Sequence, residues 1–160
     1  MTDIGSYAGV GSRATPPRIL ALMTRLATML QQQGWTLHSG GAKGADTAFY
    51  DGLIKPRQCK IWLADDATKA AIKLSSQYHP AWDRCSAYAR QLHGRNAQIM
   101  LGDDLNDPVK FVICWTKGGL TTGGTGQALR IAQAKDIPIF NLFYPQTVND
   151  MERKLKENNS

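Results

Sequence analysis

Three glycine-rich segments carry the residues best suited to chemistry in this sequence. They are GVGSR (Gly9–Arg13), SGGAKGAD (Ser39–Asp46) and GGLTTGGTG (Gly118–Gly126). Each follows an apolar, strand-like run and precedes a helical pattern. Glycine lets backbone N–H groups approach a phosphate without hindrance from a Cβ atom, and the amino end of the following helix attracts anions. The three segments together predict a phosphate-binding site.

The candidate ligand contacts are polar and glycine positions of these segments, together with an Arg-Asn pair and one tryptophan outside them. The full set is Gly11, Ser12, Arg13, Ser39, Gly40, Gly41, Lys43, Gly44, Asp46, Arg95, Asn96, Trp115, Thr122, Gly123, Gly124, Thr125 and Gly126. Several positions have a second interpretation. Arg13 and Arg95 could pair with carboxylates of the fold, and Asp46 could orient its own loop by hydrogen bonds. Trp115 could belong to the core instead of stacking on a base.

Two common nucleotide motifs and the usual metal motifs do not fit. SGGAKGAD lacks the GK[ST] ending of a P-loop. GVGSRA matches GxGxxG only superficially, because no acidic residue follows at the distance that ribose binding requires. His38, His79 and His93 lack metal-ligand spacing, and the three cysteines form no CxxC pair. We therefore expect no metal and no resident cofactor.

Strand and helix patterns alternate along the chain, which implies parallel strand pairing. The expected strands are Ser6–Val10, Trp35–His38, Cys59–Leu63, Phe111–Trp115 and Ile137–Leu142. The expected helices run from Thr15 to Gly34, over Ala45–Leu53, from His79 to about Leu92, and over Gln127–Ala134 and Val148–Lys156. Asp65–Tyr78 fits a helix or a long loop, and Ala97–Leu101 is a short apolar segment.

These elements predict an α/β fold with a single Rossmann-like, doubly wound and mostly parallel sheet that has helices on both faces. One domain would cover residues 1–160, with a core over about 6–143 and a C-terminal helix over about 145–157. In such a sheet, ligands bind at the carboxyl ends of the strands. The three glycine-rich segments should therefore meet at one edge.

Composition is compatible with this fold and with an anionic partner. The length of 160 residues suits one domain, and the net charge of +6 favours a nucleotide or nucleic acid, although a lysine-rich surface gives the same number. The apolar runs are too short to span a bilayer, and the first residues lack the pattern of a signal peptide. We expect a cytoplasmic protein with no membrane partner.

The order of these motifs resembles the DprA/Smf–LOG (SLOG) superfamily, and most closely the Rossmann-like core of DprA/Smf DNA-processing proteins. The resemblance rests on GVGSR, SGGAKGAD, the Arg95-Asn96 pair and TGGTGQALRIA, and it covers roughly Tyr7–Leu142. It implies that these motifs form an anion pocket and that the chain self-associates as a homo-oligomer. LOG-type enzymes use a glutamate late in the third loop. Here Arg130 stands at that position, and the only glutamates are Glu152 and Glu157.

Three functions follow, in order of preference. The first is a stand-alone module that senses or sequesters a phosphate-containing nucleotide or nucleotide-derived ligand. The second is DprA-like binding of single-stranded DNA in recombination or DNA processing, which should weaken with salt. The third is LOG-like nucleotide N-glycosidase activity with Asp46 or Asp83 in place of the glutamate. The sequence favours a binding protein over an enzyme.

Overall fold

The computed structural model describes residues 3–158 and has a five-stranded sheet in which every pairing is parallel. The strand order is β3-β2-β1-β4-β5. The strands are β1 (Gly5–Gly9), β2 (Trp35–Gly40), β3 (Cys59–Trp62), β4 (Val112–Cys114) and β5 (Ile139–Asn141). The predicted doubly wound α/β fold is confirmed, and all five expected strands are present.

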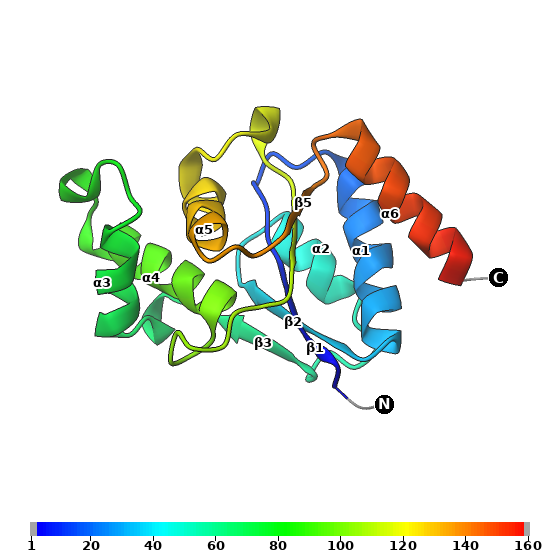
Figure 1. Ribbon diagram of the computed structural model, residues 1–160, viewed down its shortest axis with the longest axis horizontal. Helices are drawn as coiled ribbons and strands as arrows, with labels where there is room; N and C mark the ends of the chain where they lie inside the picture. The colour runs from blue at the N-terminus through cyan, green and yellow to red at the C-terminus, as the bar shows by residue number, and fades with distance from the viewer. Residues whose placement is uncertain (1–2, 159–160) are drawn as a thin grey trace.

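Helices cover both faces of this sheet (Figure 1). One face packs against α1 (Pro17–Gln32), α2 (Ala45–Asp51) and α6 (Pro145–Asn158). The other packs against α4 (Ala87–Leu101) and α5 (Gly123–Ala134), and α3 (Lys69–Ser76) packs on α4. Three short 3₁₀ helices, Ala64–Asp66, Trp82–Arg84 and Lys117–Gly119, lie in the connections.

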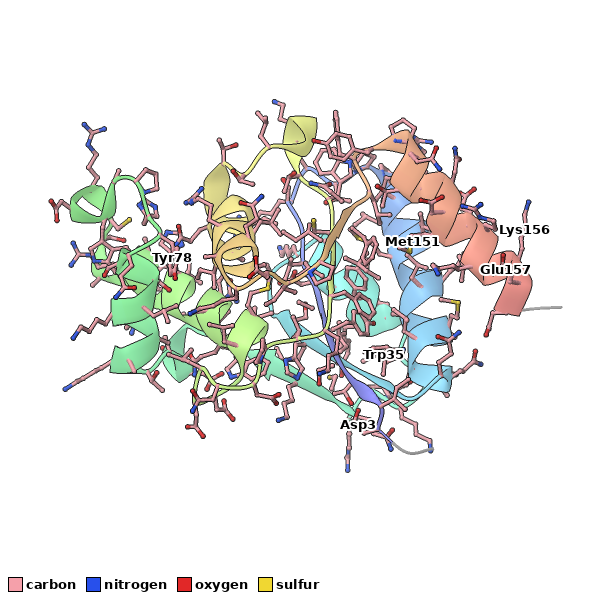
Figure 2. The ribbon with its side chains drawn as sticks, in the orientation of Figure 1. Asp3, Trp35, Tyr78, Met151, Lys156 and Glu157 are labelled. Atoms are coloured by element: carbon pink, nitrogen blue, oxygen red, sulfur yellow. The ribbon has the colours of Figure 1, made fainter. Side chains whose placement is uncertain are left out.

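Successive side chains of the central strands point to opposite faces of the sheet, so the protein has two hydrophobic cores. On β1, Tyr7 is buried among the α1-side residues and Ala8 among the α4-side residues. On β4, Ile113 and Val112 divide in the same way. A strand buried on both faces carries a continuous apolar run, as FVICW does. Met151 of α6 is buried in the first core, between α6 and α1 (Figure 2).

The connection between α3 and α4 differs from the prediction. The helix expected to begin at His79 begins instead at Ala87, because the Ser86 side chain caps it by accepting a hydrogen bond from the Ala89 N–H at 3.1 Å. It continues through Gly94 to Leu101, so the expected end near Leu92 and the separate segment Ala97–Leu101 are both wrong. A Cβ on Gly94 would lie 2.7 Å from Ile72 Cγ1, so this glycine allows close packing of α4 on α3.

Two further boundaries matter for the site. The region 65–78, left open by the sequence, contains the helix α3. Helix α5 begins at Gly123 and not at Gln127, so the glycines of the third segment form its first turn. Among residues 3–158, no helix has both the length and the apolar character needed to cross a bilayer.

Candidate functional site

A cavity of about 590 Å³ opens at the carboxyl edge of the sheet, beside the neighbouring strands β1 and β4. Strand order reverses between these two strands, and open α/β sheets bind their ligands at such a switch point. The volume lies in the range of small-molecule sites, about 300–1,000 Å³. The lining residues are Val10, Gly11, Ser12, Arg13, Ala42, Asp46, Ala89, Leu92, His93, Arg95, Asn96, Thr116, Lys117, Thr122, Gly123, Gly124, Thr125 and Ala128.

The structure brings most of the sequence-predicted site residues to this cavity. Those that line it are Gly11, Ser12, Arg13, Asp46, Arg95, Asn96, Thr122, Gly123, Gly124 and Thr125. Those that do not line it are Ser39, Gly40, Gly41, Lys43, Gly44, Trp115 and Gly126. The first and third segments therefore form the walls, and the second contributes mainly through Asp46.

The loop after β1 is fixed across the switch point. The Ser12 N–H donates to the Trp115 carbonyl oxygen at 3.1 Å, and the Ser12 hydroxyl accepts from the Ala14 N–H at 3.0 Å. A Cβ on Gly11 would lie 2.6 Å from Ala45 Cβ, so only glycine lets helix α2 approach this closely. Arg13 is exposed at the rim.

The first turn of α5 offers backbone N–H groups to the cavity. Gly123 has a φ of 75°, and Thr122 at the N-cap makes no side-chain capping bond. The first N–H groups of a helix have no acceptor within the helix, and they carry its partial positive charge. Asn96 Nδ2 donates to the Gly124 carbonyl oxygen at 3.3 Å and ties this turn to α4.

Arg130 stabilises the start of α5 through hydrogen bonds. Its guanidinium donates to the Thr121 carbonyl oxygen and, at 2.6 Å, to Gln127 Oε1. Its Nε donates to the carbonyl oxygen of Tyr78 at 2.8 Å, and Tyr78 lies between α3 and α5 (Figure 2). Arg130 does not line the cavity. Arg130 thus has a structural role in this chain.

Asp46 and Arg95 both approach Gly40, and their opposite charges attract each other. A Cβ on Gly40 would lie 2.6 Å from Arg95 Nη1 and 2.9 Å from Asp46 Oδ2, so the glycine makes room for both. Asp46 accepts from the Ala42 N–H at 3.2 Å, and Arg95 Nη1 donates to the Trp62 carbonyl oxygen at 3.2 Å. The predicted loop-orienting role of Asp46 is therefore observed, and the carboxyl also lines the cavity.

Burial raises the pKa of the Asp46 carboxyl from 3.8 to about 6, although the Ala42 N–H and Arg95 both favour the charged form. Burial likewise lowers the pKa of the Arg95 guanidinium, and Asp46 opposes that shift. Because the Asp46 pKa is higher in the folded than in the unfolded chain, the folded protein binds more protons between these values. The contribution of Asp46 to the free energy of unfolding therefore falls as pH rises from about 4 to about 6.

The predicted residues outside the cavity include buried residues next to it and two exposed residues. Ser39 is buried, and its hydroxyl donates to the Gly9 carbonyl oxygen. Gly44 has a φ of 90°, and a Cβ on it would lie 3.3 Å from Arg13 Cα. Gly41 and Lys43 are exposed, and Gly126 is buried against Thr121.

Trp115 does not fit the base-stacking interpretation. It is buried in the core on the α1 side, where its ring lies 6.3 Å from the Phe143 ring. The structure agrees with the second interpretation, in which Trp115 is a core residue.

Sequence reasoning missed the wall that α4 supplies and one cation. Ala89, Leu92 and His93 line the cavity from α4, and Lys117 lines it after β4. Lys117 lies two residues after the FVICW run, so its position just past the end of a predicted strand could have indicated it. Burial, with His79 and two arginines nearby, lowers the pKa of His93 to about 4. His79 and His93, for which the sequence predicted no metal role, also meet at Cys85.

The charge of the cavity favours an anion. Arg13, Arg95 and Lys117 face it with a single carboxyl, Asp46. Apolar surface from α4 and α5 completes the wall. Comparison of the chain with models of protein families, with curated proteins and with solved structures found no match.

Proposed function

We propose that this protein binds a nucleotide or nucleotide-derived ligand through its phosphate in the switch-point cavity. The observation that carries the proposal is the convergence of the β1 loop, the first turn of α5 and three cationic side chains on one cavity. Backbone N–H groups at a helix start and arginine side chains are the two common donors to phosphate.

The remaining wall suits a base or sugar. Val10, Ala89, Leu92 and Ala128 give apolar surface, and the His93 ring is the aromatic group of the lining. The low pKa of His93 keeps this ring neutral at physiological pH, so it can pack against a base without adding charge. A sensing or sequestering role in the cytoplasm, self-association of the chain and membership of the SLOG superfamily remain predictions from the sequence.

Thermal unfolding with a panel of nucleosides and their 5′-mono-, di- and triphosphates tests the proposal. A ligand at 100 times its Kd stabilises the folded state by about 2.7 kcal/mol, which raises the Tm of a chain this size by roughly 5–10 °C. We expect such a rise with one phosphorylated class and none with the matching nucleoside. A panel without any phosphate-dependent rise would contradict the proposal. A mobility shift of single-stranded oligonucleotides that disappears at high salt, without a nucleotide response, would favour DNA binding instead.

A second candidate function, hydrolysis of the bound nucleotide, is favoured by one observation. Asp46 lines the cavity with a carboxyl pKa of about 6, close to the value that suits a general acid or base near neutral pH. Chromatography of each stabilising nucleotide after incubation tests this. Release of free base by the wild type, lost in Asp46→Asn while binding persists, would establish hydrolysis. Unchanged nucleotide would leave binding as the function.

A further inference from the structure

The loop between α3 and α4 brings three metal-binding side chains together. His79 and Cys85 lie in the loop, and His93 lies on α4. One ring nitrogen of each histidine and Cys85 Sγ all lie within 4.8 Å of one another. Cys85 Sγ is 3.9 Å from Nδ1 and 3.6 Å from Nε2 of His79, and the two imidazole centroids are 4.7 Å apart.

These separations are close to those of a bound zinc ion. Zinc binds nitrogen at about 2.0 Å and sulfur at about 2.3 Å, so tetrahedral geometry places two donor atoms about 3.5 Å apart. The pair His79–Cys85 is already within a few tenths of an ångström of that spacing. No two of the three donor atoms are more than 4.8 Å apart. His93 therefore needs to move by little more than about 1 Å at most to join the other two.

The surroundings hold the cluster together and leave donor atoms for an ion. The Trp82 ring lies 6.0 Å from the His79 ring and 6.1 Å from the His93 ring, and the Arg90 guanidinium covers Trp82 at 5.2 Å. His93 Nδ1 is buried with no hydrogen-bond partner in the described part of the chain.

Both ring nitrogens of His79 lie near the Cys85 sulfur atom. Nδ1 accepts a hydrogen bond from the Ala81 N–H at 3.0 Å, so its lone pair points toward a donor. An ion at Nδ1 would replace this hydrogen bond.

We propose that His79, Cys85 and His93 form a binding site for a divalent transition metal ion of the zinc class. Two imidazole nitrogens and one thiolate are a donor set that selects zinc over magnesium or calcium. On binding, the Cys85 thiol releases its proton to solvent, and the thiolate offsets part of the charge of the ion. A water molecule completes the tetrahedron.

The site would join the α3–α4 loop to the wall of the ligand cavity. Two of its ligands come from the loop, whereas His93 also lines the cavity. An ion there would therefore fix the loop on α4 at the position where the ring of His93 faces the ligand. This inference does not depend on which ligand the cavity binds.

Titration of the metal-free full chain with Co²⁺, followed by competition with Zn²⁺, tests the site. The wild type should bind one equivalent of Co²⁺ with a near-ultraviolet thiolate-to-cobalt band, and Zn²⁺ should displace it. Loss of an outer-shell partner alone weakens metal sites by about 10- to 100-fold, so we expect Cys85→Ala and His79→Ala to weaken Kd by more than about 100-fold. Cys59→Ala is the matched control, because Cys59 is a partly buried cysteine outside the cluster. It should bind Co²⁺ as the wild type does.

Circular dichroism of each variant separates loss of the site from loss of the fold. Both substituted ligands lie in a loop and neither is fully buried, so the spectra should match the wild type. Saturating Zn²⁺ should raise the Tm of the wild type by several degrees and leave that of Cys85→Ala unchanged. Absence of binding by the wild type, equal binding by Cys85→Ala, or loss of binding in Cys59→Ala would each overturn the proposal.

Discussion

Substitution of two glycines near the start of α5 should have different effects: at Gly124 it should weaken ligand binding, and at Gly126 it should lower stability. A Cβ on Gly124 would meet no protein atom within 4 Å, although the residue lines the cavity. A Cβ on Gly126 would lie 2.2 Å from the Thr121 carbonyl carbon and 2.3 Å from its oxygen. Gly124→Val therefore changes the site without touching the fold, and Gly126→Ala forces the backbone to move.

The expected magnitudes follow from these contacts. Valine and glycine differ by about 0.5 kcal/mol in helix propensity, so the unfolding free energy of Gly124→Val should stay within about that amount of the wild type. Gly126→Ala should lose about 1–3 kcal/mol by overpacking, which lowers Tm by roughly 2–12 °C. A valine side chain at the helix start removes one charge-assisted hydrogen bond to phosphate. This costs about 1.5–3 kcal/mol, or roughly 10- to 150-fold in Kd.

Thermal unfolding of both variants, with and without the nucleotide that most stabilises the wild type, measures both effects. Gly124→Val should have a wild-type Tm without ligand, and with ligand at 100 times the wild-type Kd its shift should fall to about half of the wild-type shift or less. A full ligand shift in Gly124→Val would refute the role of the α5 turn. A fall in the unliganded Tm of Gly124→Val as large as that of Gly126→Ala would refute the structural reasoning.

Three further predictions concern charge and burial. Asp46→Asn should raise the free energy of unfolding above pH 6 by at most about 3 kcal/mol and leave it unchanged below pH 4. Urea unfolding of both proteins across this pH range measures the effect. A difference between variant and wild type that does not change with pH would contradict the raised pKa. Tyr7→Phe should raise the free energy of unfolding by about 1 kcal/mol, because the buried Tyr7 hydroxyl has no hydrogen-bond partner in the described residues. A lower free energy of unfolding in urea would show that the hydroxyl makes a hydrogen bond. Arg13→Ala should weaken nucleotide binding about tenfold in calorimetry. Arg18 is an exposed arginine outside the cavity, so Arg18→Ala should bind as the wild type does. Equal effects of the two substitutions would indicate that only the net charge matters.

Much of the fold was predictable because its strands are short apolar runs between amphipathic helices. FVICW has the pattern of a strand buried on both faces, and β4 lies at its centre. Loops that follow parallel strands share an edge, so the meeting of Gly11–Arg13 with the third segment was also predictable.

The parts that the sequence did not reveal depend on contacts between distant elements. Gly94 in HGRN looked like the end of a helix, but its lack of a side chain serves the packing of α4 on Ile72. With that helix ended near Leu92, the position of His93 beside the cavity could not be seen. Gly40 and Ser39 belong by composition to a phosphate-binding loop. In the structure, Gly40 makes room for Asp46 and Arg95, and Ser39 holds the end of β1 through the Gly9 carbonyl oxygen.

The most direct test of the account follows the backbone amides of the site by ¹⁵N nuclear magnetic resonance. A nucleoside 5′-monophosphate from the class that stabilises the protein is titrated into the labelled chain, and the matching nucleoside serves as control. The amide signals of Gly11, Gly123 and Gly124 should shift strongly with the phosphorylated ligand and weakly with the nucleoside. Equal shifts with both ligands, or shifts confined to residues remote from the β1–β4 edge, would contradict a phosphate site at this cavity.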